Sequence, residues 1–318
     1  MQKIHYLCQK IWFPKEDFLR KLSRMNIENI VKSLSDYIVA PTASALKVII
    51  RSGRPSLPPG PPPIRPLIIM GNGPSLRSFL DFAGNQGEEW RKGFDMAAVN
   101  FAAITPEFFL LRPERYVLAD PHFFRYPADD PKVERLWENL ARCDWPMQLW
   151  IPASAPTDIL TLLAKLAPCV TLCRMNLTPV EGYGPLADML VDKALGMPRP
   201  RNVLIPAIMT AVVTGYRKIY IVGADHSWSR TLWVDDENHV VSVQPHFYKD
   251  DENERRRVQS EYAGYHLHDI LESLTVAFRS YFDIRRHAER HGTLIINATP
   301  ESFIDSFPRC DYAQMTPQ

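Results

Sequence analysis

After residue 66 the chain alternates short apolar runs with helical stretches, and this alternation restricts the fold more than any other feature. Short apolar runs predict buried strands, and the helical periodicity between them predicts helices. Strands that alternate with helices form βαβ units and a parallel sheet covered on both faces. The sequence therefore predicts an α/β fold, a Rossmann-like and mostly parallel sheet with helices on both faces.

The predicted strands are Leu67–Met70, Asp95–Val99, Arg115–Ala119, Gln148–Ile151, Val170–Arg174, Lys218–Val222 and Thr293–Ile296. We expect helices after Ser75, after Pro131, after Thr157, near Ile205 and across Arg256–Arg290.

Two segments precede this region. Residues 1–50 place aromatic and aliphatic residues at helical spacing among lysines and arginines, which predicts an amphipathic helical arm. Such an arm either packs on the body or on a second subunit of a homo-oligomer, or it lies on an anionic membrane surface. Residues 51–66 contain seven prolines and two glycines, which predicts an extended linker. The main domain then covers residues 67–318.

The charge balance argues against nucleic acid as a partner. Lysine and arginine number 37 against 36 aspartates and glutamates, a net charge of +1, whereas nucleic-acid-binding domains carry a basic surplus. No run reaches the ~18–20 apolar residues of a membrane span, and the N-terminus lacks a signal-peptide pattern. We therefore expect a cytoplasmic protein. The five cysteines include no CxxC pair, so we expect reduced thiols and no metal site.

The first predicted strand leads into the loop Gly71-Asn72-Gly73-Pro74-Ser75-Leu76. Glycines permit a tight turn and a close approach of the backbone to a ligand. Ser75 can cap the following helix, and free N–H groups at a helix start attract phosphate. The loop therefore predicts a phosphate site, although a purely structural turn would use the same residues.

The strand Lys218–Val222 is followed directly by Gly223-Ala224-Asp225-His226-Ser227-Trp228. Ligands bind at the carboxyl ends of strands in open α/β sheets. Asp225 can orient the imidazole of His226 for proton transfer, and Trp228 can stack on a base or a sugar. The alternative is that Asp225 caps a turn and His226 is a satisfied polar residue.

Polar residues also follow two other predicted strands. Asp120 and His122 come after the third strand, and they suggest substrate contacts because no third metal ligand accompanies them. Asn297 and Thr299 come after the last strand, where they either line the pocket or cap a turn.

The segment 230–244 predicts a hairpin or lid, because the acidic turn Asp235-Asp236-Glu237-Asn238 separates two apolar stretches. A lid over a reactive donor excludes water that would hydrolyse it. Pro245-His246-Phe247-Tyr248 follows this lid-like insertion.

Three motifs together resemble a known family in order and spacing. Gly71–Leu76, Asp95–Asn100 and Thr214–Asp225 resemble segments of the bacterial sialyltransferases that build ganglioside-like lipooligosaccharide caps. The same opening, GNGPSL, occurs in archaeal pterin diphosphokinases and in motility-associated glycosylation factors. The resemblance covers about residues 66–308.

The resemblance implies a metal-independent enzyme without a cofactor, whose donor substrate is a CMP-linked sugar. A histidine would act as general base, and tyrosines would support the departing phosphate. By this resemblance His246 is the base and Tyr248 assists the phosphate, with His226 and the pair His266 and His268 as alternative bases. The chain departs from the family at 226–228, where the sialyltransferases carry an aromatic pair.

The resemblance also implies which residues would hold the donor. Asn72, Gly73 and Ser75 would contact the cytidine and phosphate, and Asn100 would contact the nucleotide or the sugar. The full expected donor site is Gly71, Asn72, Gly73, Pro74, Ser75, Asn100, Asp120, Gly223, Trp228, Asn297 and Thr299.

The function that follows is a glycosyltransferase. It would move sialic acid or a related sugar to a bacterial surface glycan, a lipopolysaccharide or capsule, whose acceptor is a glycan or lipid-linked glycan. An amphipathic arm would suit an enzyme peripheral on the inner face of the cytoplasmic membrane. The alternatives are a Mg²⁺-dependent pterin-type diphosphokinase and a non-catalytic assembly factor of the same fold.

Overall fold

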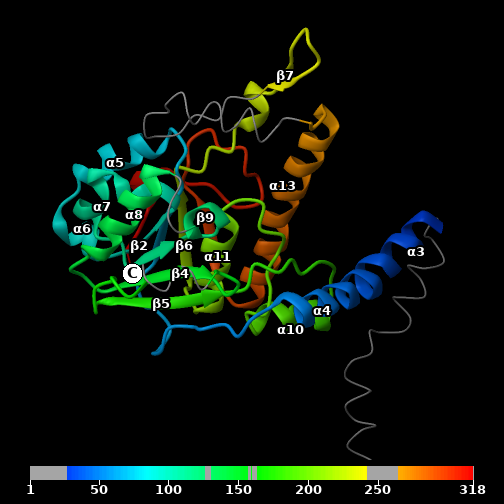
Figure 1. The fold of residues 1–318 in the computed structure, drawn as a ribbon, viewed down its shortest axis with the longest axis horizontal. Helices are drawn as coiled ribbons and strands as arrows, with labels where there is room; N and C mark the ends of the chain where they lie inside the picture. The colour runs from blue at the N-terminus through cyan, green and yellow to red at the C-terminus, as the bar shows by residue number, and fades with distance from the viewer. Residues whose placement is uncertain (1–26, 126–129, 157–158, 160–162, 242–263, 318) are drawn as a thin grey trace, which may run out of the picture.

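A computed structural model describes residues 27–125, 130–156, 159, 163–241 and 264–317 (Figure 1). Its elements are α3 (Ile27–Leu34), η1 (Ser35–Val39), α4 (Ala40–Arg51), β1 (Leu67–Met70), α5 (Leu76–Gly84), α6 (Glu88–Lys92), β2 (Asp95–Val99), η2 (Asn100–Ile104), α7 (Pro106–Leu111), β3 (Arg115–Val117), η3 (Pro121–Phe124), α8 (Pro131–Ala141), β4 (Met147–Pro152), β5 (Val170–Met175), α10 (Pro185–Asp192), α11 (Leu204–Val213), β6 (Lys218–Val222), η5 (Trp228–Thr231), β7 (Trp233–Val234), β8 (Val240–Val241), α13 (Leu267–Arg290), β9 (Leu294–Asn297) and η6 (Tyr312–Gln314).

Seven strands form one parallel sheet in the order β5-β4-β3-β2-β1-β6-β9. The predicted α/β fold with a parallel sheet is confirmed, and each predicted strand is present within two residues of its predicted ends. Strands β1 to β5 follow one another outward, and the chain then returns to the other side of β1 to form β6. This reversal between β1 and β6 is a topological switch point, where open α/β sheets bind ligands.

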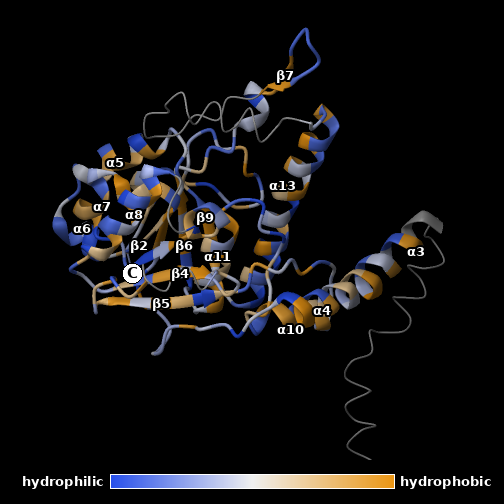
Figure 2. Ribbon diagram, in the orientation of Figure 1, coloured by the Kyte–Doolittle hydropathy of each residue, from blue (hydrophilic) through white to orange (hydrophobic). Residues whose placement is uncertain are grey.

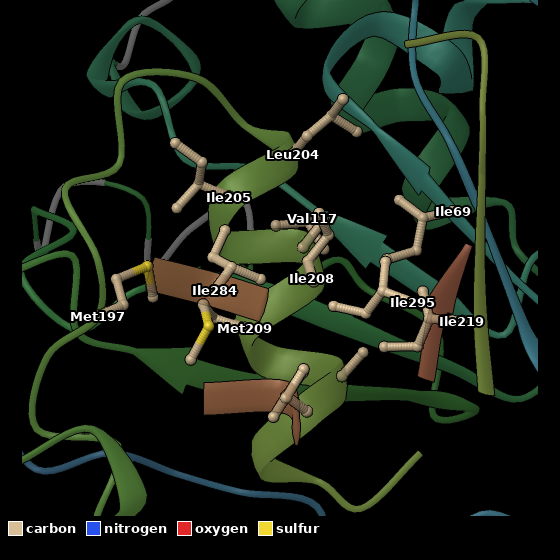
Figure 3. Close-up of a cluster of buried hydrophobic side chains, with 14 of the residues drawn as sticks. Ile69, Val117, Met197, Leu204, Ile205, Ile208, Met209, Ile219, Ile284 and Ile295 are labelled. Carbon is tan, nitrogen blue, oxygen red and sulfur yellow. The ribbon is translucent and has the colours of Figure 1, made fainter. Parts of the chain in front are cut away.

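Alternate residues of the strands point to opposite faces of the sheet, and helices cover both faces. On one face Ile69 and Ile219 pack against Ile208 of α11, with Ile284 of α13 nearby (Figure 3). Helix α11 is buried from Leu204 to Val212, as its almost wholly apolar sequence requires. The other face packs against α5, α7 and α8. Apolar residues on both sides of each strand thus account for the three-layer arrangement.

Residue 27 is the first residue that the structure describes. From there to Arg51 the predicted arm is helical and consists of α3, η1 and α4. Pro41, Ser44 and Val48 of α4 are buried against the body, and the Lys47 ammonium lies 3.1 Å from the carboxylate of Glu181. Packing on the body, one of the two readings of the arm, therefore holds for one side of this helix.

The proline-rich segment after α4 is not a free spacer. Ser52 donates a hydrogen bond to the Thr178 hydroxyl, and the Gly53 N–H donates to Asn176 Oδ1. Ser56 then forms an antiparallel bridge with Arg174 of the edge strand β5. Proline prevents a regular ladder, so the segment is an extended strap fixed to the sheet edge by single contacts.

The predicted hairpin is present as β7 and β8, which pair in antiparallel fashion and project from the body (Figure 1). Helix α13 begins at Leu267, later than the predicted helix Arg256–Arg290, and residues 256–263 lie outside the described residues. Most of the start of the helix expected after Thr157 also lies outside them. Within the described ranges no helix is both long enough and apolar enough to cross a membrane.

Candidate functional site

A cavity of about 540 Å³ opens at the carboxyl ends of β1, β2, β3 and β6, at the switch point of the sheet. Two further cavities bounded by described residues hold about 20 Å³ each, which is too little for a small-molecule ligand, whereas the volume at the switch point is in the range of such sites. It is lined by Gly71, Asn72, Gly73, Pro74, Asn100, Ala119, Asp120, Pro121, Leu177, Pro200, Arg201, Asn202, Val203, Leu204, Gly223, Asp225, His226, Ser227 and Trp228.

The glycines of the β1 and β6 loops let these two loops touch. A Cβ atom at Gly71 would overlap the carbonyl oxygen of Gly223, and one at Gly73 would overlap the Asp225 carboxylate. Gly223 itself has a φ of +65°, a conformation that glycine adopts without strain. The sequence suggested that these glycines give a ligand access to the backbone. The structure shows instead that their main use is contact between loops.

The carboxylate of Asp225, a residue of the β6 loop, lies at the start of helix α5. Its Oδ2 accepts a hydrogen bond of 2.8 Å from the Ser75 hydroxyl, and the Ser75 N–H points at the same carboxylate at 3.3 Å. Ser75 therefore does not cap α5 through its side chain, contrary to the expectation. The N–H groups of Gly73, Leu76 and Arg77 are bonded to carbonyl oxygens. A carboxylate thus takes the position at this helix start where a phosphate was expected.

Three asparagines of the cavity lining carry buried polar atoms without a partner. Among the described residues, Asn72 Oδ1, Asn100 Oδ1 and Asn202 Nδ2 are buried and have no hydrogen-bond partner, and all three residues belong to the cavity lining. A buried polar group without a partner costs about 1–3 kcal/mol. A ligand that supplies two donors and one acceptor at these positions would remove that cost.

The orientation of the Asn202 carboxamide is fixed by its neighbours. Its Oδ1 accepts from the backbone N–H of Leu204 at 3.1 Å and from the Tyr281 hydroxyl at 3.0 Å. A backbone N–H can only donate, so the oxygen of the carboxamide must face it, and the NH₂ group is left over. Because the Tyr281 hydroxyl gives its proton to Asn202, it accepts one from His226 Nε2 at 2.6 Å.

His226 is a buried and uncharged part of the wall. Burial lowers the pKa of its imidazole to about 3, and its ring lies 4.2 Å from that of Trp228, centroid to centroid. Its φ of 52° is left-handed, which is uncommon outside glycine and clusters at functional sites. An imidazole with this pKa is a weak base near neutral pH. His226 therefore fits a positioning role better than the alternative role of general base.

Of the other predicted residues, Asp120 lines the cavity. Its Oδ1 accepts from the His122 N–H at 2.8 Å, and the His122 ring pairs with Asp130 at 3.2 Å outside the lining. Asn297 and Thr299 do not line the cavity. Asn297 bonds to Ile304 and Thr299, and the Thr299 hydroxyl bonds the backbone of the β6 loop from behind. For these two residues the alternative of a structural turn is correct, because protein groups satisfy their polar atoms.

The remaining predicted bases are His246, His266 and His268. His246 and Tyr248 lie outside the described residues. His266 caps helix α13 and stacks on His268, and both side chains are exposed. Neither of these two histidines lines the cavity.

Arg201, Asn202 and Tyr281 were not predicted from the sequence. Arg201 and Asn202 precede the apolar helix α11, where an asparagine is a recognised start signal that could have been noticed. Arg201 is exposed and is the only lysine or arginine in the described lining. Tyr281 carried no such signal, because a tyrosine inside a long helix is usually a core residue.

Comparison with known proteins gives few matches. No protein-family model matches the chain, and no curated protein matches it. Among solved structures, the MAf glycosyltransferase from Magnetospirillum magneticum AMB-1 is similar over 88% of this chain, with 10% sequence identity and a TM-score of 0.49. The matched region is 39% of that protein, so the chain spans about two fifths of its length.

Proposed function

We propose that the chain is a glycosyltransferase that binds a nucleotide-linked sugar in the cavity at the switch point. The observation that carries this proposal is the set of three asparagines with unpartnered buried atoms around a space of about 540 Å³. A nucleotide sugar offers hydroxyls, ring nitrogens and carbonyl groups, which can satisfy both the amide oxygens and the amide NH₂. The volume also lies in the range of small-molecule sites.

The position of the one cationic side chain in the described lining supports a donor whose phosphate lies near α11. Arg201 and the free NH₂ of Asn202 stand together ahead of that helix, and both can donate to phosphate oxygens. Asp225 already accepts from Ser75, so the α5 side of the cavity favours neutral parts of the ligand. Trp228 is available to stack on a base or a sugar ring.

The finer form of the proposal is a CMP-linked sialic acid or related sugar, transferred to a surface glycan, as the motif resemblance implies. The acceptor hydroxyl would form a bond to the anomeric carbon of the sugar. The bond from that carbon to the phosphate oxygen would break, and its electron pair would stay on the phosphate. The hydroxyl proton would pass to a base, for which His246 remains the sequence prediction.

Thermal unfolding with CMP, CDP, UDP and ATP, each with and without Mg²⁺, tests the proposal. We expect CMP to raise the melting temperature without Mg²⁺. The Arg201→Ala variant should lose most of that rise, whereas Arg54→Ala, which removes an exposed arginine outside the cavity lining, should keep it. Stabilisation by ATP only with Mg²⁺ would favour a diphosphokinase. No response to any nucleotide would favour an assembly factor without a donor site.

A further inference from the structure

We infer that the outer face of the N-terminal arm docks on an anionic lipid surface. The arm here means the continuous helix formed by α3, η1 and α4, residues 27–51. About 25 residues of helix span ~37 Å, and Figure 1 shows this helix at the periphery of the molecule, with α3 extending away from the sheet.

The arm has one face committed to the protein. Pro41, Ser44 and Val48 are buried, and the Tyr183 N–H donates to the Asp36 carbonyl oxygen at 2.8 Å. The Ser44 hydroxyl accepts from the Glu181 N–H at 2.9 Å. These contacts fix the orientation of the helix about its own axis. The face opposite to them therefore points away from the body.

Figure 2 shows hydrophobic residues along α3 and α4, interspersed with hydrophilic ones. Ile49 and Ile50 are 79% and 72% exposed, and they are adjacent to each other rather than single. The exposed aliphatic side chains of this face are Val31, Leu34, Ile38, Val39, Leu46, Ile49 and Ile50. Exposure of this many large apolar side chains in one stretch marks an interaction surface.

The charges that accompany this face identify the partner. Lys32, Arg51 and Arg54 are exposed. The only acidic residue within 31–54 is Asp36, which is half-buried on the side that faces Tyr183. Within residues 31–54, an apolar stripe with flanking cations and no exposed carboxylate matches anionic headgroups above an acyl layer.

The same charges disfavour a second copy of this chain as the partner. A pair of arms packed through this face would bring Lys32 and Arg51 of each copy together, in either relative direction. The arm itself carries two acidic residues, Glu28 and the half-buried Asp36, against the three basic residues Lys32, Lys47 and Arg51. The sequence of residues 1–26, which lies outside the described residues, adds six lysines and arginines against two acidic residues. It therefore adds charge of the sign that an anionic surface attracts.

Co-sedimentation of the full chain with vesicles tests this inference. We expect binding to vesicles of phosphatidylcholine mixed with phosphatidylglycerol, weaker binding in high salt, and little binding to phosphatidylcholine alone. A variant with Ile38→Glu, Ile49→Glu and Ile50→Glu should reduce binding about tenfold or more. A second variant, Lys32→Glu with Arg51→Glu, should bind less while it keeps the apolar face.

The matched control places glutamate at equally exposed apolar positions elsewhere. Leu110 on α7 and Ile64 are 79% and 78% exposed, and Leu110→Glu with Ile64→Glu should leave vesicle binding unchanged. Retained binding in the triple arm variant, or no binding of the unmodified chain, would overturn the inference. A dimer in sedimentation velocity that the triple variant dissociates would assign the face to self-association instead. Nucleotide stabilisation, measured on the same variants, reports separately on the cavity.

Discussion

Asn202 is the residue on which the proposed donor site depends most directly. Its carboxamide is held by the Leu204 N–H and by the Tyr281 hydroxyl, and its NH₂ is the buried donor left without a partner among the described residues. Tyr281 contacts the cavity only through Asn202 and His226. It is therefore a positioning residue, and its hydroxyl can be removed without deleting any group of the lining.

Tyr281→Phe should weaken nucleotide binding by about tenfold, the effect of ~1.4 kcal/mol. The reason is that Asn202 would be free to rotate and His226 would lose the acceptor for its Nε2–H. Isothermal titration with CMP measures the change. The control is Tyr220→Phe, which removes another buried tyrosine hydroxyl, bonded to the Thr316 N–H away from the cavity. Equal affinities of Tyr281→Phe and the unmodified chain would contradict this account.

The depressed pKa of His226, about 3, makes stability depend on pH. The unfolded chain protonates this imidazole near its ordinary pKa of ~6.5, whereas the folded protein keeps it neutral down to about pH 3. As pH falls below ~6.5 the unfolded state binds the extra proton, so the free energy of unfolding decreases by up to ~1.4 kcal/mol per pH unit. The stability is fully present above that pH.

Urea unfolding between pH 4 and 7.5 measures this slope, which includes His287, whose pKa burial also lowers, to about 4. His226→Gln keeps an N–H for the Tyr281 hydroxyl but cannot be protonated. In this variant the slope of the unfolding free energy against pH should be smaller by up to ~1.4 kcal/mol per pH unit, which corresponds to one proton fewer bound on unfolding. An unchanged slope would show that His226 is protonated in the folded protein.

At the scale of elements, the site depends on how closely the ends of β1 and β6 approach. The β1 loop reaches the β6 loop through two glycines, and the Ser75–Asp225 hydrogen bonds close the contact. The sheet order, with β6 directly beside β1, brings these loops together. The width of the cavity is set by this contact on one side and by the start of α11 on the other.

Gly73→Ala should destabilise the fold by ~1–3 kcal/mol, the usual cost of forcing extra atoms into a packed site. The new Cβ would overlap the Asp225 carboxylate and lie 2.8 Å from the Gly223 carbonyl oxygen. Thermal unfolding measures the loss. Gly84→Ala at the end of α5, where nothing lies within 4 Å of the added Cβ, should be neutral or stabilising. Equal melting temperatures of the two variants would show that the loops can separate at no cost.

At the scale of the molecule, the two proposed functional surfaces share no residue. The cavity is formed by strand ends and the start of α11, and the proposed lipid-binding surface is formed by the outer side of the arm. Sites without shared partners usually contribute additively to free energies. An enzyme that acts on a lipid-linked glycan gains from both, because docking brings the cavity to a surface that carries its acceptor.

Combining Arg201→Ala with the triple arm substitution tests this separation. Vesicle binding should fall as in the arm variant alone, and nucleotide stabilisation should fall as in Arg201→Ala alone. Co-sedimentation and thermal shift on the four proteins of the cycle measure both effects. An interaction term above ~0.5 kcal/mol in either assay would indicate coupling between the arm and the cavity.

The sequence by itself determined the seven strands and about half of the residues of the cavity wall. Apolar runs fixed the seven strands because burial on both faces leaves little choice of residue, and glycine and polar residues marked the strand ends. This pattern identified Gly71, Asp120 and Trp228, the motif resemblance identified Asn72 and Asn100, and all five line the cavity.

Only the tertiary structure decided which groups meet. Ser75 and Asp225 are 150 residues apart, and Asn202 and Tyr281 are 79 apart. Their hydrogen bonds depend on the strand order and on the packing of α13 against α11, which no local pattern encodes. The carboxylate of Asp225, which follows β6, lies at the start of α5, where the sequence predicted a phosphate. Which face of the arm is exposed depends on which face packs against the body. The local pattern of apolar and polar residues determines the helices and strands. Contacts between residues far apart in the sequence determine which groups each side chain bonds to.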